Sequence, residues 1–114
     1  MTSAEIVGFK QLEDKADEVA GVMKSLANPR RLLLLCKLAE LGRASVGQLA
    51  DAIGLSQSAM SQHLALLRDE GVVGFDRSGQ SVFYRIADPR VEALMATLYR
   101  LYCAPADAPS KGIL

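Results

Sequence analysis

The chain has 114 residues, which suits a single domain, and its 13 basic residues balance its 13 acidic ones. A formal net charge of zero is unlike that of a nonspecific nucleic-acid binder, although it permits a specific one. No apolar run approaches the roughly 18 residues of a membrane-spanning helix, and no secretion signal opens the chain, so the sequence predicts a cytoplasmic protein.

Motifs of common enzymes and cofactor sites are absent from the sequence. It has no phosphate-binding loop, no dinucleotide fingerprint and no nucleophile elbow. One histidine and two cysteines outside any C-x-x-C pair do not supply the ligands of a zinc finger. We therefore expect neither an enzyme nor a resident cofactor or metal.

Two helices are predicted in the first third of the chain, over residues 5–26 and 29–41. The first places apolar residues at steps of three and four, which gives one apolar face. Asn28 and Pro29 are typical of a helix start, because asparagine can cap free N–H groups and proline needs no N–H bond at the first helical position. The second helix is apolar nearly all round and is expected to be the buried centre of the domain.

Residues 45–71 predict two short helices joined by a tight turn. Apolar residues share one face of the first helix, Gly54 ends it, and Ser56 caps the second. The outer face of the second helix is polar with almost no charge, and it carries Ser56, Gln57, Ser58, Ser61, Gln62 and His63. Because glutamine can pair with adenine and serine with several bases, this face is typical of a recognition helix, although a plain helical hairpin would share the periodicity.

Residues 72–87 alternate apolar and polar side chains on both sides of a turn-forming segment, which predicts a β-hairpin. A hairpin directly after a recognition helix is the wing of a winged helix. Arg77 and Gln80 lie at the predicted tip and are expected to contact DNA. The alternative is a hairpin that only covers the core.

An apolar stripe runs along a final helix predicted over residues 89–103. A small domain has little core left for such a helix, so we expect the stripe to form a dimer seam with the first helix. The expected interface residues are Phe9, Leu12, Leu94, Met95, Leu98 and Tyr102. The predicted fold is mainly α with a small β-hairpin, in the order α-α-α-α-β-β-α. It is a homodimeric winged helix-turn-helix over residues 5–103 with a flexible C-terminal tail at 104–114.

With this order of elements, the sequence resembles the ArsR/SmtB family of bacterial repressors. The resemblance is carried, between Leu12 and Cys103, by Asn28–Arg31, Leu55–Ser58, Ser61–Leu64, Leu67–Arg68, Glu70–Val73 and Phe83–Ile86. It implies a homodimer that binds double-stranded operator DNA with an inverted repeat and leaves it when an inducer is sensed.

The metal-binding positions of that family are not filled in this sequence. Ser45 and Gly47 stand where the family has a cysteine pair, and Arg90 stands where it has a histidine two residues after Asp88. None of these replacements is a soft-metal ligand, so we expect neither of the two common metal sites.

Cys36 on the second predicted helix and Cys103 on the last resemble the cysteine pair of the family's thiol-sensing branch. That resemblance implies that reactive sulfur species or oxidants join the two thiols and release the repressor from DNA. Two alternatives stay open for the pair: the cysteines are ligands of a metal or metalloid, or each is an inert core residue. For the whole chain, the alternative is a winged-helix protein-interaction module that no longer binds DNA.

Overall fold

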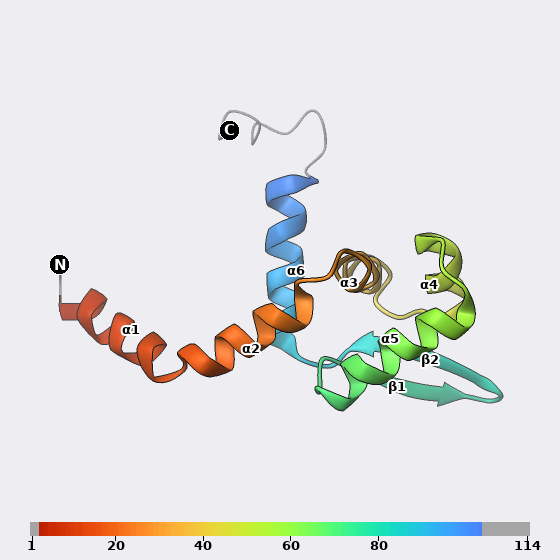
Figure 1. The fold of residues 1–114 in the computed structure, drawn as a ribbon, viewed down its shortest axis with the longest axis horizontal. Coiled ribbons are helices and arrows are strands. Elements are labelled where there is room, and N and C mark those ends of the chain that lie inside the picture. Colours follow the sequence, from red (N-terminus) through yellow and green to blue (C-terminus); the bar gives the residue numbers. More distant parts are fainter. Residues whose placement is uncertain (1–2, 104–114) are drawn as a thin grey trace.

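A computed structural model describes residues 3–103, so the predicted tail at 104–114 lies outside the described residues. The elements in chain order are α1 (Ser3–Asp14), α2 (Ala16–Leu26), α3 (Pro29–Leu41), α4 (Val46–Ile53), α5 (Gln57–Asp69), β1 (Val73–Ser78), β2 (Ser81–Ile86) and α6 (Pro89–Tyr102). In Figure 1, α3 stands between α6 and the α4–α5 pair, the hairpin projects beyond α5, and α1 reaches away from the rest. This order confirms the predicted winged helix-turn-helix fold.

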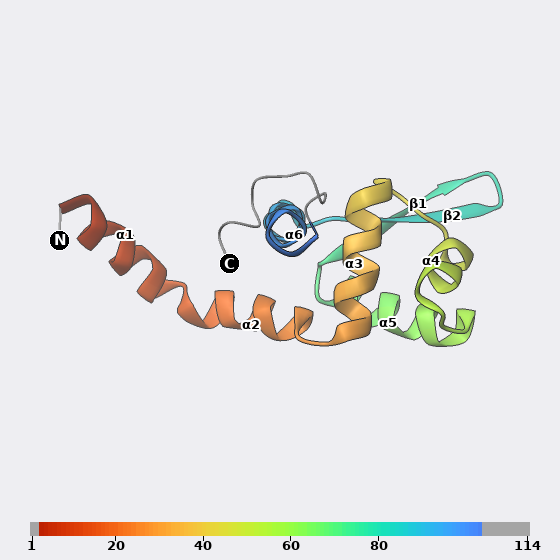
Figure 2. The ribbon, with the colours of Figure 1, turned by 90° about the horizontal axis from the view of Figure 1, so that it is seen from above.

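The helix predicted over residues 5–26 is interrupted in the structure, which corrects the expected number of helices. Lys15 leaves the helical conformation at φ −108° and ψ 7°, and its N–H donates to the Leu12 carbonyl at 3.1 Å, three residues back. Leu26 anchors the C-terminal end of α2 in the core, and Val22 packs against that core. The axis of α1 does not continue that of α2, and the helix extends away from the domain (Figures 1 and 2).

Polar caps start the helices where the sequence predicts them. The Asn28 side chain accepts hydrogen bonds from two N–H groups of the first turn of α3, at 3.0 and 3.2 Å. Ser56 Oγ accepts from the Ala59 N–H at 3.0 Å and caps α5. Gly54 ends α4 in the left-handed region at φ 79°, a conformation that glycine adopts without strain. These local features fix the tight turn between α4 and α5.

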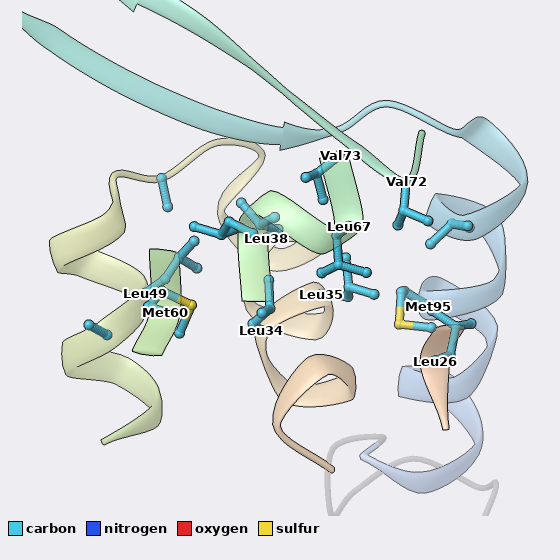
Figure 3. Close-up of a cluster of buried hydrophobic side chains, with 14 residues drawn as sticks. Leu26, Leu34, Leu35, Leu38, Leu49, Met60, Leu67, Val72, Val73 and Met95 are labelled. Atoms are coloured by element: carbon cyan, nitrogen blue, oxygen red, sulfur yellow. The ribbon is translucent and has the colours of Figure 1, made fainter. Parts of the chain in front are cut away.

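One hydrophobic core joins α3, the helix-turn-helix, the start of the hairpin and α6 (Figure 3). Its fully buried large side chains are Leu34, Leu35, Leu38, Leu49, Met60, Leu64, Leu67, Val91 and Met95. The structure places α3 at the centre of this core, as the sequence predicts, although its neighbours cover only part of its circumference. Leu33 stays 55% exposed and Leu41 47% exposed.

The hairpin β1–β2 is antiparallel and is closed by a two-residue loop between Ser78 and Ser81, which face each other. Gly79, the first loop residue, has φ 63°, as glycine does in the type II′ turns that suit the twist of a hairpin. At the other end, Ala44 pairs with Tyr84 and ties the hairpin to the loop before α4. The wing is therefore anchored at its base and free at its tip.

The apolar residues of α6 divide between the core and the surface, which corrects one expected interface residue. Met95 is only 1% exposed and packs in the core of its own subunit (Figure 3), because it lies one turn after buried Val91 on the face that meets α3. Leu94 and Leu98 are partly buried against the same core. Tyr102 remains exposed.

Among the residues that the structure describes, no helix combines the length and the apolar character needed to cross a membrane.

Candidate DNA-binding surface and thiol site

The polar residues of α5 form an exposed surface beside the wing. Met60, Leu64 and Leu67 anchor the inner face of the helix in the core, so the opposite face is turned to solvent. The exposed side chains on that face are Ser56, Gln57, Ser58, Ser61 and Gln62. A helix presented in this way has the width and the donor and acceptor groups to enter a major groove.

His63 differs from its polar neighbours because it is half-buried. Its Nδ1 atom is buried and has no hydrogen-bond partner among the described residues. The ring therefore lies at the edge of the recognition surface and can offer only part of its polar surface to DNA.

The wing presents cations next to this surface. Arg77 and Gln80 are both exposed at the outer end of the hairpin. The Arg77 guanidinium lies 5.7 Å from the centre of the Phe75 ring, and that of Arg68, from the last turn of α5, lies 5.1 Å from the same ring. Phe75 thus joins the recognition helix to the wing through two cation–π contacts.

The structure adds Arg43 to the candidate DNA-contacting cations, and the sequence did not predict it. Arg43, in the loop before α4, lies 4.3 Å above the ring of Phe83 on β2. The isolated bridge of Ala44 with β2 creates this contact, and neither partner belongs to a recognisable motif. Only the three-dimensional pairing could reveal it.

The two cysteines come from distant parts of the chain and border one cavity. Both are free thiols; Cys36 is half-buried on α3 and Cys103 is exposed at the end of α6. The shared cavity has a volume of about 290 Å³ and is lined by Leu33, Cys36, Lys37, Glu40, Ala52, Ile53, Tyr99 and Cys103. Exposed Leu33 forms part of its wall.

The environments of the two thiols differ in a way that affects their reactivity. Burial raises the pKa of the Cys36 thiol, and the nearby Cys103 raises it further because two thiolates repel each other. The Cys36 Sγ also contacts the Met95 Sδ at 3.9 Å. Next to Met95, a second cavity of about 380 Å³ is lined by Cys36, Ala39, Glu40, Met95, Ala96, Tyr99 and Arg100. Access therefore favours Cys103 as the first thiol to react.

Exposed apolar residues on α1 and at the end of α6 form candidate dimer surfaces. Phe9 is 63% exposed, Leu12 54% and Tyr102 78%. These side chains are large and apolar, and their own subunit leaves them uncovered. A second protein surface could bury them.

The positions that correspond to the family's metal ligands have structural roles here. Ser45 caps α4 in a capping box with Gln48. Arg90 donates to the carboxylates of Asp88 and Glu18, which ties the start of α6 to α2 and holds the pKa of both carboxyl groups below its usual range. A guanidinium thus occupies the place next to Asp88 where a metal ligand would be needed.

An exposed recognition helix, a tight turn and a β-wing on one core define a winged-helix DNA-binding regulator. The family described as bacterial regulatory protein, arsR family, matches residues 28–74. The HTH-type transcriptional regulator YgaV of Escherichia coli K12 is 43% identical over 93 residues, which are 82% of this chain and 94% of that protein. The chain belongs to the ArsR family of transcriptional regulators, and it is not an enzyme.

Solved structures agree with this assignment. The transcriptional repressor BigR from Xylella fastidiosa has a TM-score of 0.76 and 40% identity, over 84% of this chain and 97% of that one. Reduced HlyU from Vibrio cholerae N16961 has a TM-score of 0.75 and 41% identity, over 82% of this chain and 98% of that one.

Proposed function

We propose that the chain is a homodimeric repressor that leaves its operator when Cys36 and Cys103 become joined through sulfur. The observation that carries this proposal is the cavity between α3 and α6 that both thiols border. Among the relatives, BigR is a transcriptional repressor, and the HlyU structure is that of the reduced protein.

The exposed position of the recognition helix supports DNA binding by a dimer. Two copies of α5 about 34 Å apart would enter successive major grooves on one side of the duplex. The exposed apolar side chains of α1 and α6, with Phe9, Leu12 and Tyr102 among them, would form the interface. Since the chain carries no net charge, affinity would come from two recognition helices and two wings rather than from a general basic surface.

The chemistry needs a donor of sulfane sulfur, such as a polysulfide. The Cys103 thiolate attacks a sulfane sulfur, forms Cys103–S–SH and expels a shorter sulfide. The Cys36 thiolate then attacks the Cys103 Sγ, expels HS⁻ and leaves a disulfide, so the two electrons lost by the thiols reduce the sulfane sulfur. If Cys103 carries a longer sulfur chain, the Cys36 thiolate can attack the sulfur atom bonded to the Cys103 Sγ. The product is then a trisulfide, and the rest of the chain leaves as sulfide. Such a bridge can join thiols whose Cα atoms are farther apart than the roughly 7 Å that a disulfide tolerates.

A link between these cysteines would act on the DNA-binding unit through α3. This helix packs against α6 on one side and against α4 of the helix-turn-helix on another. Drawing α3 toward the end of α6 would change the angle between α6, which belongs to the proposed dimer interface, and the recognition helix α5. A differential binding energy of about 1.4 kcal/mol is enough to weaken DNA binding tenfold.

The test compares Cys36→Ser and Cys103→Ser with the wild type on an operator duplex selected from random DNA. We expect all three reduced proteins to bind equally, and only the wild type to dissociate after polysulfide treatment. Intact mass should show that the wild type loses both thiol hydrogens, with or without added sulfur. Release of either variant by polysulfide would refute the paired-thiol mechanism. Failure of the reduced wild type to bind any duplex would instead favour a protein-interaction module.

A further inference from the structure

One aromatic ring holds two guanidinium groups in the angle between α5 and the hairpin. The ring is that of Phe75 on β1. Arg68, in the last turn of α5, and Arg77, further along β1, place their guanidinium carbons 5.1 and 5.7 Å from its centre. Both distances are within the roughly 6 Å over which a ring attracts a cation. The two charges can therefore be no farther apart than the sum of these distances, although they repel each other.

The protein itself does not neutralise either of these cations with an ion pair. Among residues 3–103, each carboxylate that pairs with an arginine pairs with Arg85 or Arg90. Arg68 and Arg77 are exposed and take part in none of these pairs. A ring orients a guanidinium group and leaves its charge in place. Two uncompensated charges on one ring therefore favour an anionic ligand.

We propose that Arg68 and Arg77 bind phosphates of the DNA strand that lies between α5 and the wing, and that Phe75 positions both cations for this contact. A helix in a major groove and a wing in the next minor groove have one sugar–phosphate strand between them. By the helical period, Arg68 lies on the same side of α5 as Gln57 and Ser61, so it is turned toward the bound duplex. This inference rests on the DNA binding of the proposed function and not on the thiol switch.

The hairpin makes Phe75 a fixed platform for the two side chains. Phe75 and Tyr84 face each other across the strands, with ring centres 5.6 Å apart and ring planes inclined by 46°. Tyr84 in turn exchanges two backbone hydrogen bonds with Ala44, at 3.0 and 2.7 Å. Since the ring orients both guanidinium groups before DNA arrives, less side-chain entropy is lost when they contact phosphate.

The first experiment measures the salt dependence of DNA affinity by fluorescence anisotropy, with the reduced full chain and its operator duplex. Arg68→Ala should lower the slope of log K against log salt by about 1.8, because each subunit of a dimer loses one phosphate contact. Arg68→Lys keeps the charge and should keep the slope. An arginine in the last turn also interacts with the helix dipole, but loss of that interaction leaves the salt slope unchanged. A wild-type slope in Arg68→Ala would overturn the contact.

A double-mutant cycle tests the positioning role of Phe75. Phe75→Leu removes the ring and should weaken operator binding about tenfold. In an Arg68→Ala, Arg77→Ala background the same change should have little further effect, because the ring acts through these two cations. Phe75→Tyr keeps an aromatic face and should bind as the wild type does. Equal losses from Phe75→Leu in both backgrounds, or a loss in Phe75→Tyr as large as that in Phe75→Leu, would overturn the positioning role.

Phe83→Leu is the matched control for this cycle. Phe83 lies on the opposite face of the hairpin, since side chains alternate along a strand, and its ring carries Arg43 at 4.3 Å instead. Its effect on binding should be the same with and without Arg68 and Arg77. Coupling as strong as that of Phe75→Leu would overturn the assignment of Phe75 as the platform. If the reduced wild type binds no duplex, DNA binding itself is refuted together with this contact. If the wild type binds and the salt slopes stay parallel, the contact alone is refuted.

Discussion

Replacing Arg77 with alanine should reduce the salt dependence of DNA binding. Arg77 is exposed near the tip of the wing, where its guanidinium rests against Phe75. Its acidic neighbour Asp76 is engaged by Arg85 at 3.0 Å, so the charge of Arg77 remains available to a phosphate. In a dimer the substitution removes two such contacts.

The size of the effect follows from counterion release. Each phosphate contact contributes about 0.9 to the slope of log K against log salt, so two wings contribute about 1.8. Over a rise from about 50 to 200 mM salt, this part of the slope corresponds to about 12-fold in affinity. The wild type should therefore lose about 12-fold more affinity than Arg77→Ala across that range.

Fluorescence anisotropy at a series of salt concentrations, with one operator duplex and one random duplex, measures both slopes. Arg77→Lys is the matched control, because it keeps the charge and should keep the wild-type slope. Parallel slopes for Arg77→Ala and the wild type would show that the wing tip does not touch phosphate. A change confined to the operator duplex would show that Arg77 reads sequence rather than backbone.

Three further predictions concern bases, subunits and thiols. Gln57→Ala should cost operator binding about 1–3 kcal/mol and random DNA less; equal losses in a binding titration would remove Gln57 from the base contacts. Phe9→Asp should give folded monomers that bind the operator weakly, since Phe9 is 63% exposed and outside the core; a dimer that survives in sedimentation analysis would contradict the assigned interface. With limiting iodoacetamide, peptide mass spectrometry should find Cys103 labelled before Cys36, because burial raises the pKa of Cys36; labelling of Cys36 first would reverse the proposed order of attack.

Local chemistry in the sequence was sufficient to predict most of the fold. Asn28, Ser56 and Gly54 are caps whose effect depends on the next few residues, and the structure places all three as expected. The break at Lys15 has no such signal, because the apolar period continues across it. Gly21, a residue type with low helix propensity, lies inside α2 and not at the break.

The candidate site was less accessible to sequence reasoning because it depends on how helices face one another. The stripe on α6 could not be divided into core and surface without knowing that α3 meets Met95 and not Tyr102. For the same reason the sulfur contact between Cys36 and Met95 could not be foreseen. The polar face of α5 was predictable, because it follows from helical period alone.

Because α1 projects from its own subunit, its helical structure is expected to depend on dimer formation and therefore on protein concentration. A helix of 12 residues is marginal in water by itself, and α1 leaves Phe9 and Leu12 uncovered by its own subunit. In the proposed dimer, the partner would supply the surface that holds this segment helical. Subunit association and ordering of α1 would then be one event, so the measured dimer affinity includes the entropy of ordering the arm. Substitutions that change only the helix propensity of α1 would shift the dissociation constant without touching the interface.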